Sequence, residues 1–195
     1  MSRRALIGLF GGSFDPIHHG HLIVAQAVLE ALDLEEMRFV PAFEQPFKRG
    51  RHGAPPEVRA RMVSLAIEGQ LCFRLETAEL DRGGPSYTVD TLRALQAREP
   101  GKRFALLVGA DAARELDQWR EGALIPTLAQ VVVFARPGVD LAEIPPGAQV
   151  VRVPRLDISA TEIRGRVARN QPIRYWVPDP VAACILAQGL YLKDA

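Results

Sequence analysis

The sequence predicts an α/β fold with a doubly wound, mostly parallel sheet, followed by a small helical segment at the C-terminal end. Short apolar runs alternate along the chain with stretches that are apolar at helical spacing. Several runs are continuously apolar, residues 104–108 (FALLV) most clearly, as expected for strands buried on both faces of a parallel sheet. This alternation ends after residue 154. We therefore expect one domain over residues 1–195, with an α/β core at 1–154 and a helical part at 155–195.

Six strands are expected, at residues 5–10, 37–41, 72–76, 104–108, 131–135 and 150–153. Helices are expected between them at 21–32, 56–68, 88–98 and 111–116, and this alternation is typical of doubly wound sheets. In the last part, helices are expected at 159–169 and 180–188, separated by several prolines. Gly189 is placed to end the final helix.

Composition excludes several classes of partner. The net charge of +1 gives no overall field that would attract nucleic acid or an anionic membrane, so an anionic ligand must be bound by a local cluster. No apolar segment is long enough to cross a bilayer or to act as a signal peptide. The two cysteines, Cys72 and Cys184, have no zinc-binding spacing, so we expect two buried free thiols in a cytoplasmic protein. Homo-oligomerisation is left open.

The first motif is residues 11–21, GGSFDPIHHGH, which follow the first expected strand and lead into the first helix. It contains His18, His19 and His21, three of the four histidines of the chain. Ligands of open α/β sheets bind at the carboxyl ends of strands. Backbone N–H groups at a helix start, with imidazoles that can carry charge, make an anion site. We interpret the motif as a phosphate site. A zinc site is disfavoured because no further soft ligands lie nearby in the sequence, and a purely structural turn is disfavoured because three clustered imidazoles would be an unusual choice for one.

The second motif is residues 157–164, DISATEIR, at the start of the first C-terminal helix. Ser159 and Glu162 have the spacing of a capping box, which predicts Ser159 as the N-cap. The first helical N–H groups, the Thr161 hydroxyl and the Arg164 guanidinium then lie at one end of the helix and suit a triphosphate. We expect the two helix N-termini to hold one polyphosphate.

Together the two motifs resemble the paired signatures of the nucleotidyltransferase superfamily that transfers adenylyl groups from ATP. Within it, the chain resembles the bacterial nicotinate-nucleotide adenylyltransferases. Further points of resemblance are PSYT at 85–88, GAD at 109–111, Trp119, RPG at 136–138 and GLY at 189–191, which together span nearly the whole chain. The resemblance implies a Rossmann-like fold. It also implies a reaction of NAD biosynthesis, in which ATP and nicotinate mononucleotide give deamido-NAD (nicotinate adenine dinucleotide) and pyrophosphate.

The resemblance also assigns roles to residues. It implies that ATP is bound by Gly11, Gly12, Ser13, Phe14, His18, Gly20, His21, Asp111, Ser159, Thr161 and Arg164. Of these, three residues would be catalytic. His18 and His21 would stabilise the charge that builds on the α-phosphate, and Arg164 would hold the β- and γ-phosphates that leave. Nicotinate mononucleotide would be bound by Lys48, Tyr87, Thr88, Asp111 and Trp119. Mg²⁺ would arrive with ATP, without a metal site of the protein's own, and no tightly bound organic cofactor is expected.

Two positions depart from the family pattern. Phe47 stands where relatives commonly carry histidine, and Arg120 follows Trp119 where an aromatic residue is frequent. Arg120 could itself pair with nicotinate if its side chain points inward.

Three other functions remain to be separated by experiment. They are transfer to nicotinamide mononucleotide, transfer to phosphopantetheine, and a non-catalytic nucleotide sensor. A carboxylate needs only donors, and the helix start at Ser86–Thr88 supplies them, which favours the acid over the amide. Both phosphate motifs are intact, which disfavours the sensor.

Overall fold

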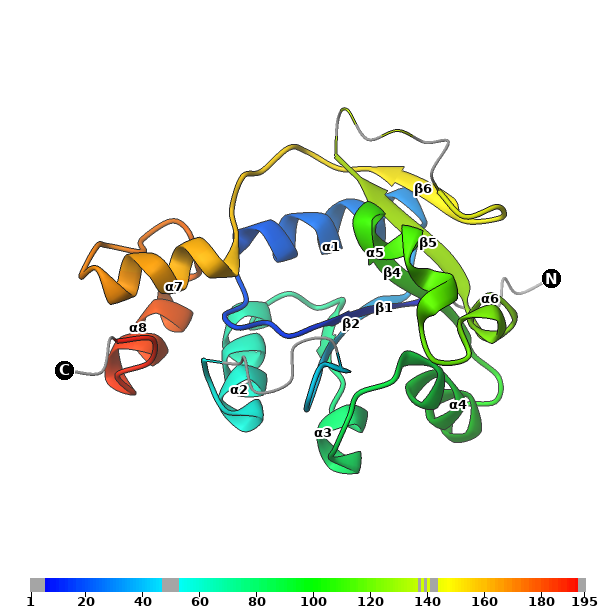
Figure 1. Cartoon of the computed structure of the whole chain (residues 1–195), viewed down its shortest axis with the longest axis horizontal. Coiled ribbons are helices and arrows are strands. Elements are labelled where there is room, and N and C mark those ends of the chain that lie inside the picture. The colour runs from blue at the N-terminus through cyan, green and yellow to red at the C-terminus, as the bar shows by residue number, and fades with distance from the viewer. Residues whose placement is uncertain (1–5, 47–52, 137, 139, 141–143, 193–195) are drawn as a thin grey trace.

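The structure is a computed structural model that describes residues 6–46, 53–136, 138, 140 and 144–192. Its centre is a six-stranded sheet in the order β3-β2-β1-β4-β5-β6, in which every pairing is parallel (Figure 1). The strands are β1 (Leu6–Gly12), β2 (Glu36–Pro41), β3 (Phe73–Leu75), β4 (Arg103–Gly109), β5 (Gln130–Ala135) and β6 (Gln149–Arg152). The strand order reverses between β1 and β4, and open α/β sheets bind ligands at the carboxyl ends beside such a reversal.

Helices cover both faces of the sheet. The α-helices are α1 (His19–Ala31), α2 (Pro56–Ile67), α3 (Ala78–Arg82), α4 (Thr88–Arg98), α5 (Ala110–Arg114), α6 (Ile125–Leu128), α7 (Ala160–Ala168) and α8 (Asp179–Ala187). Short 3₁₀ turns lie at η2 (Leu116–Gln118) and η3 (Gly122–Leu124). Side chains of β1 alternate between the faces: Phe10 packs in the cluster formed with α1, α2, α7 and α8, and Leu9 in the cluster formed with α4, α5 and α6.

The fold class and the expected elements are confirmed. Each of the six strands and six helices begins and ends within two residues of its expected position. Gly189 follows the last helix with φ +59°, and Gly189 and Leu190 donate to the carbonyls of Leu186 and Ile185, the pattern of a Schellman motif. The helices α3 and α6 and the two 3₁₀ turns were not expected. Each is a short element that shares a strand-to-strand connection with an expected helix, so the alternation of strands and helices does not require it.

The expectation of two buried thiols is wrong for one of them. Cys184 is buried in the core, but Cys72 is only half-buried, because it precedes β3 at the open edge of the sheet. Both thiols are free. Within the described ranges, none of the helices has the length and apolar character needed to span a membrane.

Arg59 on α2 connects two loops around the carboxyl end of the sheet. Its side chain is fully buried. The guanidinium donates to the backbone carbonyls of Ser13 at 2.6 Å, Phe43 at 3.0 Å and Ala54 at 3.2 Å. Ser13 belongs to the loop that follows β1, and Phe43 and Ala54 lie near the two ends of the connection between β2 and α2. One buried cation therefore holds the segments from which the site below is built.

We expect Arg59→Met to lower the free energy of unfolding by about 3–5 kcal/mol, because three carbonyls would lose their buried donor. The measurement is urea unfolding at pH 7. Arg61→Met is the matched control, because Arg61 is exposed on the same helix and should change the stability by less than about 0.5 kcal/mol. Equal stability of the two variants would contradict the role given to Arg59.

Candidate active site

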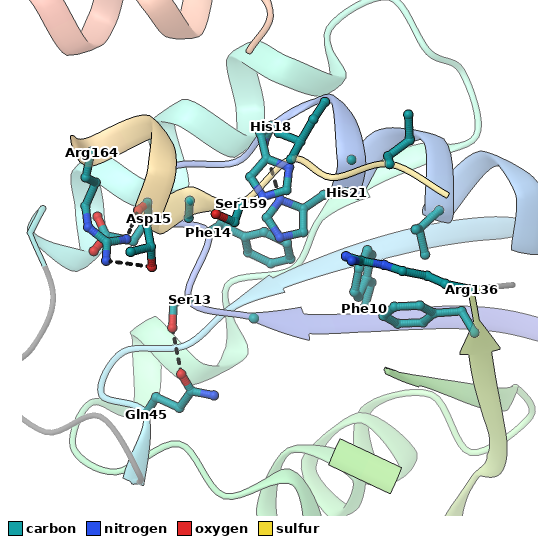
Figure 2. A pocket seen from close by; sticks show the side chains of 18 of the residues that line it. Phe10, Ser13, Phe14, Asp15, His18, His21, Gln45, Arg136, Ser159 and Arg164 are labelled. Carbon is teal, nitrogen blue, oxygen red and sulfur yellow. Dashed lines mark hydrogen bonds between the residues drawn. The ribbon is translucent and has the colours of Figure 1, made fainter. Parts of the chain in front are cut away.

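A cavity of about 560 Å³ lies at the carboxyl ends of β1 and β5. One wall is formed by β1 and its following loop, through Phe10 and residues 12–15. The next wall is formed by the start of α1, through His18, Gly20, His21 and Val24. Phe134 and Arg136 enter from β5, and residues 154–164 close the remaining side (Figure 2). Segments that are about 140 residues apart in sequence therefore line one space.

Two helix N-termini meet at this cavity. His18 is the N-cap of α1 and Ser159 is the N-cap of α7, and both residues line the cavity. The Ser159 hydroxyl accepts from the Glu162 N–H at 3.1 Å, as the capping pattern predicts. The N–H groups of Ala160 and Thr161 have no partner inside the helix, and both residues line the cavity. The expected convergence of the two motifs is thus confirmed, and the positive ends of two helix dipoles lie around one space.

The imidazoles of His18 and His21 stack, with ring centroids 3.7 Å apart (Figure 2). Burial lowers the pKa of His18 to about 4, assisted by the charges of His19 and Arg136. Burial, and then the proximity of His18, lowers the pKa of His21 well below 6.5. Both rings are therefore neutral at pH 7 without ligand. The sequence suggested imidazoles that can carry charge, and burial is the reason that they do not.

The hydrogen bonds of His21 determine its tautomer. Its Nδ1 atom accepts from the backbone N–H of His18 at 3.2 Å, so in the neutral ring the proton is on Nε2. His21 is therefore a neutral N–H donor. His18 Nδ1 is buried, and among the described residues it has no hydrogen-bond partner.

The loop between β1 and α1 is held in an unfavourable backbone conformation. Phe14 has φ +47°, which bulky side chains rarely adopt, and its ring is buried against Phe10 and His21. Such conformations cost about 1–3 kcal/mol and persist where the surroundings enforce them, often at functional sites. Here Arg59 bonds to the preceding carbonyl of Ser13, and the Ser13 hydroxyl donates to Gln45 Oε1 at 2.7 Å.

Asp15 joins the loop to distant parts of the chain. Its buried carboxylate accepts from the Tyr191 hydroxyl at 2.8 Å and from the Gly53 N–H at 2.7 Å. Its carbonyl accepts from Arg164 Nη1 at 2.7 Å, and Arg164 Nη2 also contacts the Thr161 hydroxyl at 3.3 Å. The C-terminal segment, the loop before α2 and helix α7 are therefore attached to the same residue.

A smaller cavity of about 90 Å³ lies beside the first. It is lined by Gln45, Pro46, Ser86, Tyr87, Thr88, Trp119 and Arg120. Thr88 begins α4, so a third helix N-terminus faces a cavity. Gln45 lines both cavities and is their common wall.

Comparison with known proteins identifies the family of this chain. Residues 9–166 match the family model described as cytidylyltransferase-like. A "probable nicotinate-nucleotide adenylyltransferase" of Roseiflexus sp. (strain RS-1) is 47% identical over 196 residues, which cover 96% of this chain and 98% of the relative. A protein of Thermus thermophilus with the same description is 45% identical over 185 residues, covering 95% and 98%. The chain belongs to the nicotinate-nucleotide adenylyltransferase family, within the cytidylyltransferase-like proteins.

Solved structures agree with the fold of this family. The nicotinic acid mononucleotide adenylyltransferase of Plasmodium falciparum, solved in complex with NaAD, superimposes with a TM-score of 0.79. The two sequences are 20% identical, and the match covers 96% of this chain and 97% of that one. At this identity the likeness supports the Rossmann-like architecture.

Most residues that the family resemblance singled out meet in the two cavities. The larger cavity brings together Gly12, Ser13, Phe14, His18, Gly20, His21, Ser159, Thr161 and Arg164, and the smaller brings together Tyr87, Thr88 and Trp119. Gly11 does not line either cavity. Asp111 also lies outside both linings, with a fully exposed side chain at the first turn of α5. Lys48 and Phe47 lie outside the described residues.

Other residues of the site were not expected from the sequence. Arg136 lines the larger cavity, and its position at the carboxyl end of the fifth strand was a usable signal. Gln45 lies in the loop after β2, and the sequence assigned it no role. No pattern among its neighbours in the sequence indicates that it lines both cavities. Tyr191 and Asp15, which are in contact, are 176 positions apart in the sequence, and no local pattern predicts this contact.

The lowered pKa of His18 makes stability depend on pH. Unfolded histidine binds a proton below about pH 6.5, whereas folded His18 does so only near pH 4, so acid favours the unfolded state. Over this interval the difference is worth about 3 kcal/mol. We expect the wild type to lose this amount relative to His18→Gln between pH 7 and pH 4, as measured by urea unfolding at successive pH values. Parallel stability curves for the two proteins would refute the assignment.

Proposed function

We propose that this chain transfers the adenylyl group of ATP to nicotinate mononucleotide, giving nicotinate adenine dinucleotide and pyrophosphate in NAD biosynthesis. The observation that carries the proposal is the meeting of two helix N-termini, two neutral imidazoles and Arg164 around one cavity, next to a small aromatic-lined cavity. The larger cavity has the donors that a triphosphate would need, and the smaller cavity has the aromatic wall that would stack on a flat ring. The descriptions of the family relatives support the same substrates.

The triphosphate would lie between the starts of α1 and α7. Backbone N–H groups at helix N-termini bind phosphate oxygens without carrying net charge. His21 would donate its Nε2 proton, and His18 would serve as a second imidazole donor, to the charge that builds on the α-phosphate. Arg164 and the Ser159–Thr161 helix start would hold the β- and γ-phosphates that leave. Preorganised donors of this kind are the main means by which proteins assist transfer at phosphorus.

The reaction needs little covalent chemistry from the protein. An oxygen of the mononucleotide phosphate attacks the α-phosphorus, a new P–O bond forms, and the bond to the bridging oxygen of the β-phosphate breaks. Pyrophosphate leaves with that electron pair. Because the attacking phosphate is already ionised, no general base is required. Binding both substrates in one aligned arrangement supplies much of the acceleration.

The described residues fit a divalent cation that is held by ATP. Asp15 is the one carboxylate that lines the larger cavity in the described part of the chain, and both its oxygens already accept hydrogen bonds. Those residues also form no cluster of three or more acidic, histidine or cysteine side chains that could hold a metal. Mg²⁺ would therefore be held by the triphosphate and water, and would supply additional charge neutralisation at the phosphates.

The nicotinate ring would enter the smaller cavity. Trp119 offers a surface for stacking, and the start of α4 at Thr88 offers N–H donors to the carboxylate. Lys48 near the phosphates and Asp111 at nucleotide hydroxyls remain predictions. A cytoplasmic location and the division of the domain near residue 154 are likewise predictions from the sequence.

The proposal is tested by measuring pyrophosphate release from ATP with nicotinate mononucleotide, nicotinamide mononucleotide and phosphopantetheine in parallel. We expect the highest kcat/KM with nicotinate mononucleotide. A higher value with either other acceptor would replace the substrate assignment. Absence of release with all three, despite ATP binding, would favour a nucleotide sensor.

His21→Ala should reduce kcat by about 10²–10³-fold, because it removes a preorganised donor from the transition state. The effect on ATP binding should be smaller, and His18→Ala should behave similarly. Steady-state kinetics and a direct ATP titration measure the two quantities separately. His19→Ala is the matched control, because His19 belongs to the same cluster but does not line the cavity. Turnover near the wild-type level in both His18→Ala and His21→Ala would contradict the assignment.

Arg164→Gln should raise the KM for ATP by about tenfold or more, since a charge-assisted contact with phosphate is lost. The KM for nicotinate mononucleotide should change less. Arg166→Gln on the same helix is the control, because Arg166 lies outside the cavity lining and donates to the Pro172 carbonyl. If Arg164→Gln affected both substrates equally, the helix end would bind something other than the leaving phosphates.

A further inference from the structure

The smaller cavity contains a cation, Arg120. Of the described residues that line it, Arg120 is the charged one, beside the polar Gln45, Ser86 and Thr88. Arg120 directly follows Trp119, and both residues line the cavity that would hold the ring of the substrate. The sequence left the direction of this side chain open, and the structure places it in the lining.

The backbone that carries Arg120 is held by a tight turn. The Gly122 N–H donates to the Trp119 carbonyl at 2.8 Å, and Glu121 adopts a left-handed conformation with φ +51°. A Cβ atom at Gly122 would lie 2.0 Å from the Leu116 carbonyl oxygen, so only glycine fits there. Trp119 and Arg120 are therefore presented to the cavity by a rigid segment.

The guanidinium itself is placed over an aromatic ring. Arg120 Cζ lies 4.7 Å from the centroid of Tyr87, which lines the same cavity. Such stacking orients the planar group while leaving its edge N–H donors free to meet another partner. Tyr87 is also the N-cap of α4, so the cation and a helix N-terminus lie on adjacent walls.

The neighbouring carboxylates leave most donors of Arg120 available. Asp90 Oδ2 is 3.5 Å from Arg120 Nη1, at the outer limit of a hydrogen bond. Glu121, the other nearby acid, is held in a two-pronged pair by Arg93 at 3.0 and 2.7 Å. An arginine has five N–H donors, and one long contact does not saturate them.

We propose that Arg120 determines the preference of this chain for a mononucleotide whose ring carries an ionised carboxylate over the otherwise identical amide. The inference rests on the proposed function and deepens it. A carboxylate can accept two parallel N–H bonds from a guanidinium, whereas an amide turns either a single carbonyl or a competing NH₂ donor toward it. The side chain is about half exposed, so solvent moderates the contribution. We expect it to account for about three- to tenfold of the preference.

The test compares kcat/KM for nicotinate and nicotinamide mononucleotides in the wild type and in Arg120→Gln. The ratio should fall by about three- to tenfold in the variant. The fall should come from the nicotinate value alone, with the KM for ATP unchanged. Arg120→Lys keeps the charge but loses the paired N–H donors and the planar stacking, so it should retain only part of the preference. Arg103→Gln makes the same charge change at the exposed start of β4, away from the carboxyl ends of the strands, and should leave the ratio unchanged.

Two results would overturn the inference while leaving the proposed function intact. One is wild-type kcat/KM for both mononucleotides in Arg120→Gln, so that the ratio does not change. The other is an equal loss with both mononucleotides, which would mean that Arg120 only supports the packing of Tyr87. If the wild type transferred adenylate to neither mononucleotide, the proposed function would fail first and this inference with it.

Discussion

The site depends on the hydrogen bonds that Asp15 makes from a buried position. Through its carboxylate and its carbonyl, this residue connects the loop after β1 with Tyr191 near the C-terminus, Gly53 before α2 and Arg164 on α7. A buried carboxylate is stable only when its oxygens are satisfied, so these contacts are required by the fold. They also bring the start of α7 to the start of α1. The same interactions that hold the C-terminal helices in place therefore also form the larger cavity.

Burial gives the two imidazoles a different role from the one that their sequence cluster suggests. Stacked and shielded from water, His18 and His21 are neutral before substrate binds. A neutral ring whose tautomer is set by a backbone N–H is a fixed donor, and it needs no change of protonation to act. Because the pKa of buried His18 is lowered, acid favours the unfolded state of the protein. Positive charge at the cavity is left to Arg164, Arg136 and the helix ends.

The two cavities behave as one structural unit because their walls share hydrogen bonds. Arg59 bonds the loops that follow β1 and β2, and Ser86 Oγ accepts from the Phe43 N–H at 2.9 Å, which joins the second loop to the start of α4. Gln45 stands between the cavities and accepts from Ser13. Substrates bound on either side would therefore meet one connected wall. This suits a reaction in which the alignment of two phosphates decides the rate.

The sequence by itself determined the six strands, six of the α-helices, the parallel sheet and the positions of the two motifs, because periodicity, capping and strand-to-helix transitions depend on residues within a few positions of each other. Ser159 as an N-cap and Gly189 as a helix end were readable for this reason. The tertiary structure decided which side chains share a space and which of them are shielded from water. The Asp15–Tyr191 contact and the shared wall at Gln45 depend on partners far away in sequence, and the neutral state of His21 depends mainly on its burial. Contacts between residues far apart in the chain leave no local sequence pattern, and the burial of a side chain is set by the whole fold.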